Sequence, residues 1–114
     1  MMHCSFTAKK CVPCEGGMAP LTKEVVDEYH NEIPGWEIAA DYHSLVKSYR
    51  FKNFAQAMQF VGQVAVIAEK EGHHPGITIS YNKVRLVLIT HAIGGLSEND
   101  FIVAAKINTL ELAV

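Results

Sequence analysis

The sequence is short of the features that would assign it to a membrane or to nucleic acid. No apolar run approaches the roughly 18 residues that a membrane-spanning helix needs. The first residues lack the apolar core of a secretory signal. Lysine and arginine total 10 of 114 residues, form no block, and leave a net charge of −2. We therefore expect a globular protein that neither spans a membrane nor binds nucleic acid directly.

Cysteine is also scarce, and its three copies cannot form a complete set of internal disulfides. This count favours a reducing, cytoplasmic location. Cys11 and Cys14 have C-x-x-C spacing within residues 1–19, which we expect to form an irregular N-terminal arm before a single domain at 20–114. Such spacing can hold a metal or act in redox chemistry, but no second C-x-x-C is present and the usual strand-to-helix context is missing. Unpaired thiols in a terminal arm are the preferred interpretation.

The hydrophobic pattern predicts a two-layer α+β domain. Hydrophobic residues make up 49% of the chain and charged residues 19%, which is typical of a globular protein. The expected helices cover 21–33, 54–71 and a segment from the Ser97 cap to about 112, and the expected strands cover 36–40, 45–51, 77–81 and 84–89. This order, helix-strand-strand-helix-strand-strand-helix, predicts a four-stranded antiparallel sheet with three helices on one face.

Capping residues mark the ends of these helices. Asn53 is expected to cap the longest helix at its start, and Gly72 to end it in the left-handed conformation. Ser97 and Asp100 fit a capping box for the last helix. That helix is apolar nearly all round, so we expect burial on several sides and an oligomer with the sheet or this helix at the interface.

Three of the six histidines are expected to converge at one place. His73 and His74 follow the longest helix, and His91 follows the last strand. A tight turn at Asn82-Lys83 would pair Tyr81 with Val84 and bring His74 opposite His91. Clustered imidazoles suit proton transfer near neutral pH.

Two other interpretations of this cluster exist. Three histidines could hold zinc with an open fourth position. However, adjacent side chains on an extended segment point to opposite faces, which disfavours ligation by both His73 and His74. From the residues alone, a metal site and an acid–base site are about even. Simple pairing of His74 with His91 in the sheet would leave the convergence of three histidines unexplained.

The spacing of residues around this cluster resembles the signature of the pterin-4a-carbinolamine dehydratases. The residues that carry the resemblance are Glu69, His73, His74, Pro75, Tyr81, Leu86, Leu88, Thr90 and His91. Trp36 after a Pro-Gly stop, the 95–98 run and the cysteine-containing arm also resemble members of that family.

The resemblance implies a fold and an activity. The fold is the α+β architecture above, assembled as homodimers or homotetramers. The activity is loss of water from 4a-hydroxytetrahydrobiopterin to give quinonoid dihydropterin, which recycles the cofactor of aromatic amino-acid hydroxylases. The resemblance implies no metal and no redox cofactor. Some animal members bind a homeodomain transcription factor as coactivators, which leaves a nuclear location open.

The expected catalytic residues are His73 and His91, nearest the departing hydroxyl and the ring nitrogen, with His74 orienting or transferring a proton. The expected substrate-binding residues are Glu69, Pro75, Thr90, Trp36 and Asp100. Each of three of these residues also has a purely structural interpretation. Glu69 would be a solvated carboxylate at a helix end, Asp100 would only cap its helix, and Trp36 would be a core residue. When the family resemblance is taken into account, a zinc site becomes a minor alternative to an acid–base site at the histidine cluster. A non-catalytic protein-binding module is the main rival, although the full histidine set favours retained chemistry.

Overall fold

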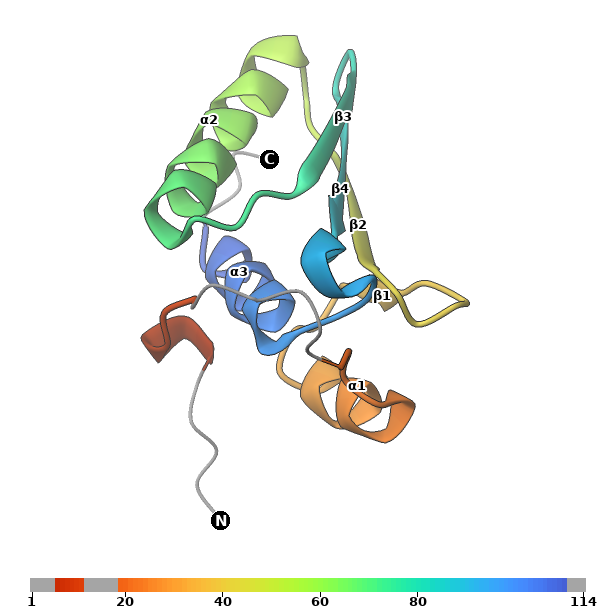
Figure 1. Ribbon diagram of the computed structural model, residues 1–114. Helices are drawn as coiled ribbons and strands as arrows, with labels where there is room; N and C mark the ends of the chain where they lie inside the picture. The colour runs from red at the N-terminus through yellow and green to blue at the C-terminus, as the bar shows by residue number, and fades with distance from the viewer. Residues whose placement is uncertain (1–5, 12–18, 111–114) are drawn as a thin grey trace.

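The computed structural model describes residues 6–11 and 19–110. A four-stranded antiparallel sheet carries its helices on one face, as the sequence predicts (Figure 1). The helices and strands are α1 (Lys23–His30), β1 (Glu37–Ile38), β2 (Leu45–Arg50), α2 (Phe54–Glu71), β3 (Gly76–Ser80), β4 (Lys83–Leu88) and α3 (Glu98–Asn108), with short 3₁₀ helices η1 (Phe6–Ala8) and η2 (His91–Ile93). The α+β prediction and the order of elements are confirmed, although the first strand is only two residues long.

The strand order is β1-β2-β4-β3, so β3 forms an edge of the sheet. All five β3 residues are exposed, although the alternation of apolar and polar residues over 77–81 is typical of a half-buried strand. Alternating residue types could not show that β3 has a neighbour on one side only.

The predicted register of the second hairpin is wrong by two residues. Ser80 pairs with Lys83, so the turn is Tyr81-Asn82 and His74 does not pair with His91. The cause lies directly after β2, because the Asn82 carbonyl accepts from the Phe51 backbone N–H and the Asn82 side chain donates to the Phe51 carbonyl, both at 2.8 Å. A shift by two keeps every side chain on its expected face.

Helix α2 has the predicted ends, but only part of its apolar stripe is buried. The Asn53 side chain accepts from the Gln56 backbone N–H at 2.9 Å, and Gly72 ends the helix with φ of 67°. Phe54 and Met58 recur at helical spacing with other apolar residues of α2, but they are 50% and 40% exposed. The buried residues are Ala57, Phe60, Val64 and Ala68. Apolar residues occur on several sides of α2, so contact with the sheet and α3 decided which of them are covered.

Helix α3 is buried by the chain's own elements. Eight of its eleven residues are buried, and its Ser97–Asp100 capping box is present. Phe6 of η1 packs against Tyr29 and Phe101, with ring centroids 5.1 and 6.0 Å away. The apolarity of this helix therefore does not require an oligomer, because α2, the sheet and η1 cover it. Within the described residues, no helix has the length and apolarity needed to cross a membrane.

Candidate active site

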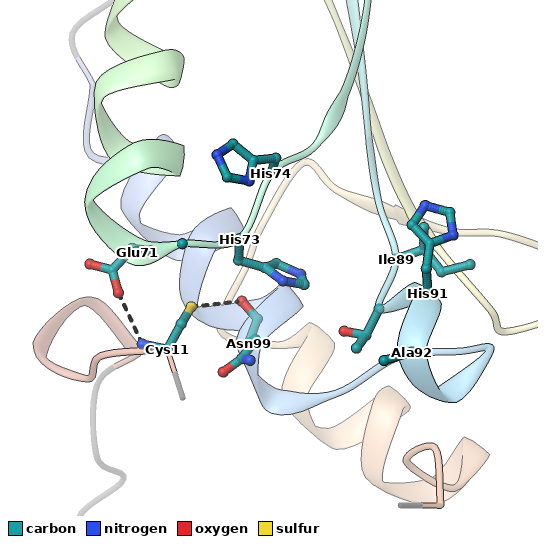
Figure 2. A pocket seen from close by; sticks show the side chains of 10 residues that line it. Cys11, Glu71, His73, His74, Ile89, His91, Ala92 and Asn99 are labelled. Carbon is teal, nitrogen blue, oxygen red and sulfur yellow. Dashed lines mark hydrogen bonds between the residues drawn. The ribbon is translucent and has the colours of Figure 1, made fainter. Parts of the chain in front are cut away.

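A pocket of about 600 Å³ opens where α2, β4 and α3 come together. Its lining residues are Cys11, Glu71, Gly72, His73, His74, Ile89, Thr90, His91, Ala92 and Asn99 (Figure 2). The chain reaches this pocket because Gly72 ends α2 in the left-handed conformation, and Pro75 then favours an extended backbone at His74. His91 arrives from the opposite side, at the start of η2. The structure thus brings the three histidines to one pocket, although by loops beyond the strands rather than by cross-strand pairing.

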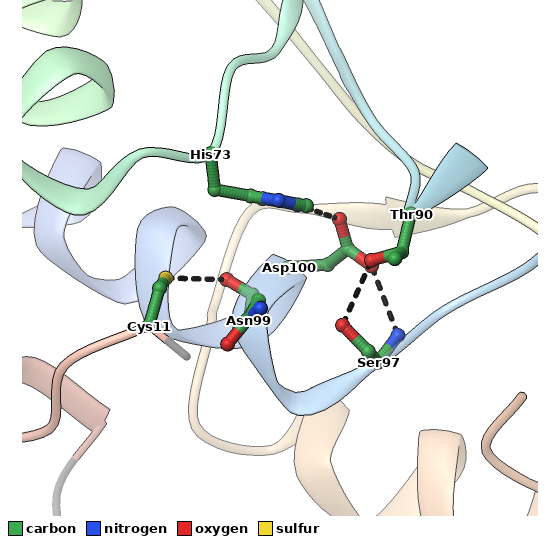
Figure 3. A network of polar contacts seen from close by, with 6 residues as sticks. All are labelled: Cys11, His73, Thr90, Ser97, Asn99 and Asp100. Carbon is green, nitrogen blue, oxygen red and sulfur yellow. Dashed lines mark hydrogen bonds and ion pairs between the residues drawn. The ribbon is translucent and has the colours of Figure 1, made fainter. Parts of the chain in front are cut away.

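The His73 ring is held by a buried carboxylate. Its Nε2 lies 2.6 Å from Asp100 Oδ1, and the two side chains are 13% and 0% exposed. Asp100 Oδ2 accepts from the Thr90 hydroxyl at 2.8 Å and from the Ser97 backbone N–H at 3.0 Å (Figure 3). Asp100 therefore caps α3 and orients His73 at the same time, which leaves Nδ1 as the ring nitrogen available to a ligand.

His74 also has a carboxylate partner, but an exposed one. Its Nε2 lies 2.5 Å from Glu69 Oε2, with the side chains 58% and 78% exposed. Water screens such a pair, so we expect this contact to orient the ring only weakly.

His91 is the histidine without such a partner. It is exposed, and within the described residues its ring makes no hydrogen bond. Figure 2 shows it on the side of the pocket opposite His73 and His74. Both of its nitrogens are therefore open to a ligand.

The N-terminal arm supplies a pocket residue that the sequence did not reveal. The backbone N–H of Cys11 donates to Glu71 Oε1 at 2.9 Å, and its Sγ lies 3.6 Å from the Asn99 carbonyl (Figure 2). Burial, reinforced by the Glu71 carboxylate, raises the pKa of the Cys11 thiol to about 12, so the thiol is uncharged at neutral pH. Cys14 lies outside the described residues. The C-x-x-C spacing drew attention to Cys11 but could not place it at this pocket, because its partner is 60 positions away.

Glu71 is a second pocket residue that sequence reasoning missed. Its Oε2 accepts from Lys106 Nζ at 2.6 Å. Hydrogen bonds from Lys106 and from the Cys11 backbone lower the pKa of Glu71 below its usual range. The glutamate is therefore ionised and links the arm, α2 and α3.

Two expected site residues neither line this pocket nor hydrogen-bond to one of its histidines. Trp36 is 2% exposed, packs in the core and donates from Nε1 to Asn108 Oδ1 at 3.0 Å. Its large apolar ring is covered by the core and takes no part in lining the pocket. Pro75 directs the backbone between His74 and β3 without lining the pocket. Within residues 6–11 and 19–110, no group of three or more His, Cys, Asp or Glu is arranged to hold a metal ion.

Fold and site together define an α+β domain whose pocket gathers three histidines and a buried carboxylate. A family model described as pterin 4 alpha carbinolamine dehydratase matches residues 19–110. The chain belongs to this family.

Bacterial relatives extend the similarity across nearly the whole chain. A Nitrosospira multiformis protein is 50% identical over 105 residues, which cover 92% of this chain and 91% of that one. A Methylococcus capsulatus protein is 45% identical over 110 residues, which cover 96% of each. Both have the provisional name pterin-4-alpha-carbinolamine dehydratase.

Solved structures agree with the fold. The Brucella melitensis "transcriptional coactivator/pterin dehydratase" is 35% identical, with a TM-score of 0.74 over 78% of this chain and 95% of that one. A pterin dehydratase-like protein, identified as a RuBisCO assembly factor in the alpha-carboxysome, is 24% identical, with a TM-score of 0.56 over 65% of this chain and 86% of that one. The latter similarity shows a shared fold alone.

Proposed function

We propose that the protein removes water from 4a-hydroxytetrahydrobiopterin to give quinonoid dihydropterin, with His73, His74 and His91 as the acid–base groups. The observation that carries this proposal is the buried Asp100–His73 pair beside a pocket that His74 and His91 also line. The pocket volume of about 600 Å³ lies in the range of small-molecule sites. Family membership supports a pterin as the ligand.

The reaction requires one proton to leave a nitrogen and one to reach the departing hydroxyl. The electron pair of the N–H bond forms the new C=N bond as the C4a–O bond breaks, so no electron donor or acceptor is needed. With the Nε2 proton of His73 directed at Asp100, the Nδ1 lone pair can accept the proton from nitrogen. His91 delivers a proton to the hydroxyl, which leaves as water. His74 then serves as the third group, which orients the substrate or returns a proton.

The predicted binding residues take different parts in this proposal. Thr90 donates its hydroxyl proton to Asp100, so it supports the His73 pair rather than the pterin ring. Glu69 orients His74. Asp100 is a positioning residue, because it contacts His73 and is itself fully buried.

Assembly as a homo-oligomer is also part of this proposal. The edge strand β3 and helix α2 expose large apolar side chains, and Tyr81 in the following turn does the same; the residues are Phe54, Met58, Val66, Ile77, Ile79 and Tyr81. A second copy of the chain would cover this surface.

A non-catalytic binding module is the rival function. The Brucella melitensis protein is described as both a coactivator and a dehydratase, so both activities have to be considered for this chain. The complete histidine set, with a buried carboxylate that orients one ring, supports catalysis because a binding surface does not need an oriented imidazole.

Dehydration of freshly generated 4a-hydroxytetrahydropterin, followed by absorbance, tests the proposal. The spontaneous rate in buffer is subtracted, and His73→Ala and His91→Ala are compared with wild type. His43→Ala is the matched control, because His43 is a histidine outside the pocket. We expect a wild-type rate well above background that is unchanged when a chelator is added. The His43→Ala control should keep this rate, and both pocket variants should lose it. A wild-type rate equal to buffer would favour the binding module, and loss with chelator alone would favour a metal site.

A further inference from the structure

The arm segment Phe6–Cys11 reaches the pocket although it lies before the family-matched span of 19–110. Three contacts anchor it. Phe6 is 5% exposed and packs against the aromatic rings of α1 and α3. Lys9 Nζ lies 3.1 Å from Glu98 Oε1. The backbone N–H of Cys11 donates to Glu71 at the pocket itself.

Glu71 connects this arm to the catalytic segment. It is the last residue of α2, two positions before His73, and its side chain is only 3% exposed. A buried carboxylate is unfavourable unless its oxygens are paired. Here one oxygen accepts from Cys11 and the other from Lys106, so release of the arm would remove one of the two donors that hold this carboxylate.

We propose that the segment Phe6–Cys11 forms a substrate-binding wall of the pocket and that Glu71 is the positioning residue that holds it there. This inference rests on the proposed function and adds the arm to the pterin site. Cys11 offers a pteridine an uncharged Cβ–Sγ surface, which suits contact with a flat heteroaromatic ring better than a charged group would. In Figure 2 this side chain lies beside Asn99, below His73.

The two parts of the site should respond differently when Glu71 is changed. The His73–Asp100 pair is held by Thr90 and Ser97, which lie on the opposite side from the arm contacts in Figure 3. Release of the arm should therefore weaken substrate binding more than it slows proton transfer. In Glu71→Met we expect KM to rise about tenfold while kcat stays within about threefold of wild type.

Alkylation of Cys11 by iodoacetamide measures the arm directly, with Cys4 and Cys14 replaced by serine in every protein compared. Glu71→Met removes the acceptor for the Cys11 N–H, and we expect labelling to accelerate about tenfold or more as the thiol becomes exposed and more acidic. Glu71→Gln keeps an acceptor oxygen and should restore labelling and KM toward wild type. Glu32→Gln, an exposed glutamate after α1, is the control and should change neither.

A second measurement uses the protein in which Glu71 is unchanged. Saturating 7,8-dihydrobiopterin should slow Cys11 labelling about fivefold or more, because the ligand covers the thiol. This measurement remains decisive even where Glu71→Met does not fold.

Three results would overturn the inference. They are dihydrobiopterin binding that leaves labelling unchanged, faster labelling in Glu71→Met with an unchanged KM, and failure of dihydrobiopterin to bind at all. Absence of dehydratase activity in wild type would reject the proposed reaction separately, since protection of Cys11 by dihydrobiopterin would still establish the arm as the wall of a pterin-binding site.

Discussion

Two histidine–carboxylate pairs in one pocket differ chiefly in their contact with water. Asp100 is fully buried beside His73, whereas Glu69 is 78% exposed beside His74. Burial strengthens an electrostatic contact and restricts the geometry of both partners, while solvent weakens an exposed pair. The Asp100–His73 pair should therefore contribute far more to activity than the Glu69–His74 pair.

Substitution of the two carboxylates by amides tests this ranking. In Asp100→Asn the amide can present its NH2 group to His73 and no longer fixes the tautomer of that ring, and we expect kcat to fall about 100-fold or more. In Glu69→Gln we expect a loss of less than about threefold. Steady-state dehydration rates across pH measure both variants, and Asp100→Asn should also shift the profile. Equal losses in the two variants would contradict the ranking by burial.

Tyr49 buries a polar group in the core, which is unfavourable for stability. The residue is 8% exposed, its ring centroid lies 4.5 Å from that of Phe60, and its hydroxyl has no hydrogen-bond partner within the described residues. Burial raises the pKa of this hydroxyl above its usual range. We expect Tyr49→Phe to raise the free energy of unfolding by about 1 kcal/mol, measured by urea denaturation.

The control for Tyr49→Phe is Tyr42→Phe. The Tyr42 hydroxyl donates to Asp27 at 3.0 Å, so its removal should give no gain. A loss of stability in Tyr49→Phe would mean that the Tyr49 hydroxyl has a partner in solution, such as water or a second copy of the chain.

At the scale of an element, the C-terminal cap of α2 positions the histidines that follow it. Gly72 has φ of 67°, a conformation that a side chain disfavours, and the chain turns there into His73. We expect Gly72→Ala to lower the free energy of unfolding by about 1 kcal/mol and to lower activity by displacing His73.

Gly62 provides a matched control within the same helix. A Cβ added there would meet no heavy atom within 4 Å, and its φ is not positive. Gly62→Ala should therefore raise the free energy of unfolding by up to about 1 kcal/mol. Urea denaturation of both variants checks the contrast, which would be refuted by equal effects of the same sign.

At the scale of the whole molecule, the uncovered apolar surface concerns assembly. Ile77 and Ile79 are each 37% exposed on the edge strand β3. Light scattering after size-exclusion chromatography should give a multiple of the 12.6 kDa chain mass. Ile79→Lys should reduce that mass, because it places a charge on the apolar face of β3 that a second copy of the chain would cover.

Thr78→Lys is the matched control for assembly, because neighbouring residues of a strand point to opposite faces. It should leave the mass unchanged. A wild-type mass of one chain would reject the oligomer.

Much of the fold and part of the site could be predicted from the sequence, because they depend on local interactions. The caps at Asn53, Gly72 and Ser97 act over a few residues, and hydrophobic spacing indicates helices and strands directly. The histidine cluster was found for a similar reason, since His73 and His74 follow a helix end and His91 follows a strand end.

Only the tertiary structure decided which distant groups meet. Contacts with Phe51 set the hairpin register, and packing against the sheet and α3 selected the buried face of α2. The partners of the site are 27 positions apart for His73 and Asp100 and 60 apart for Cys11 and Glu71. Local patterns carry no information about such pairs, because their energy arises only after the chain has folded and excluded water from them.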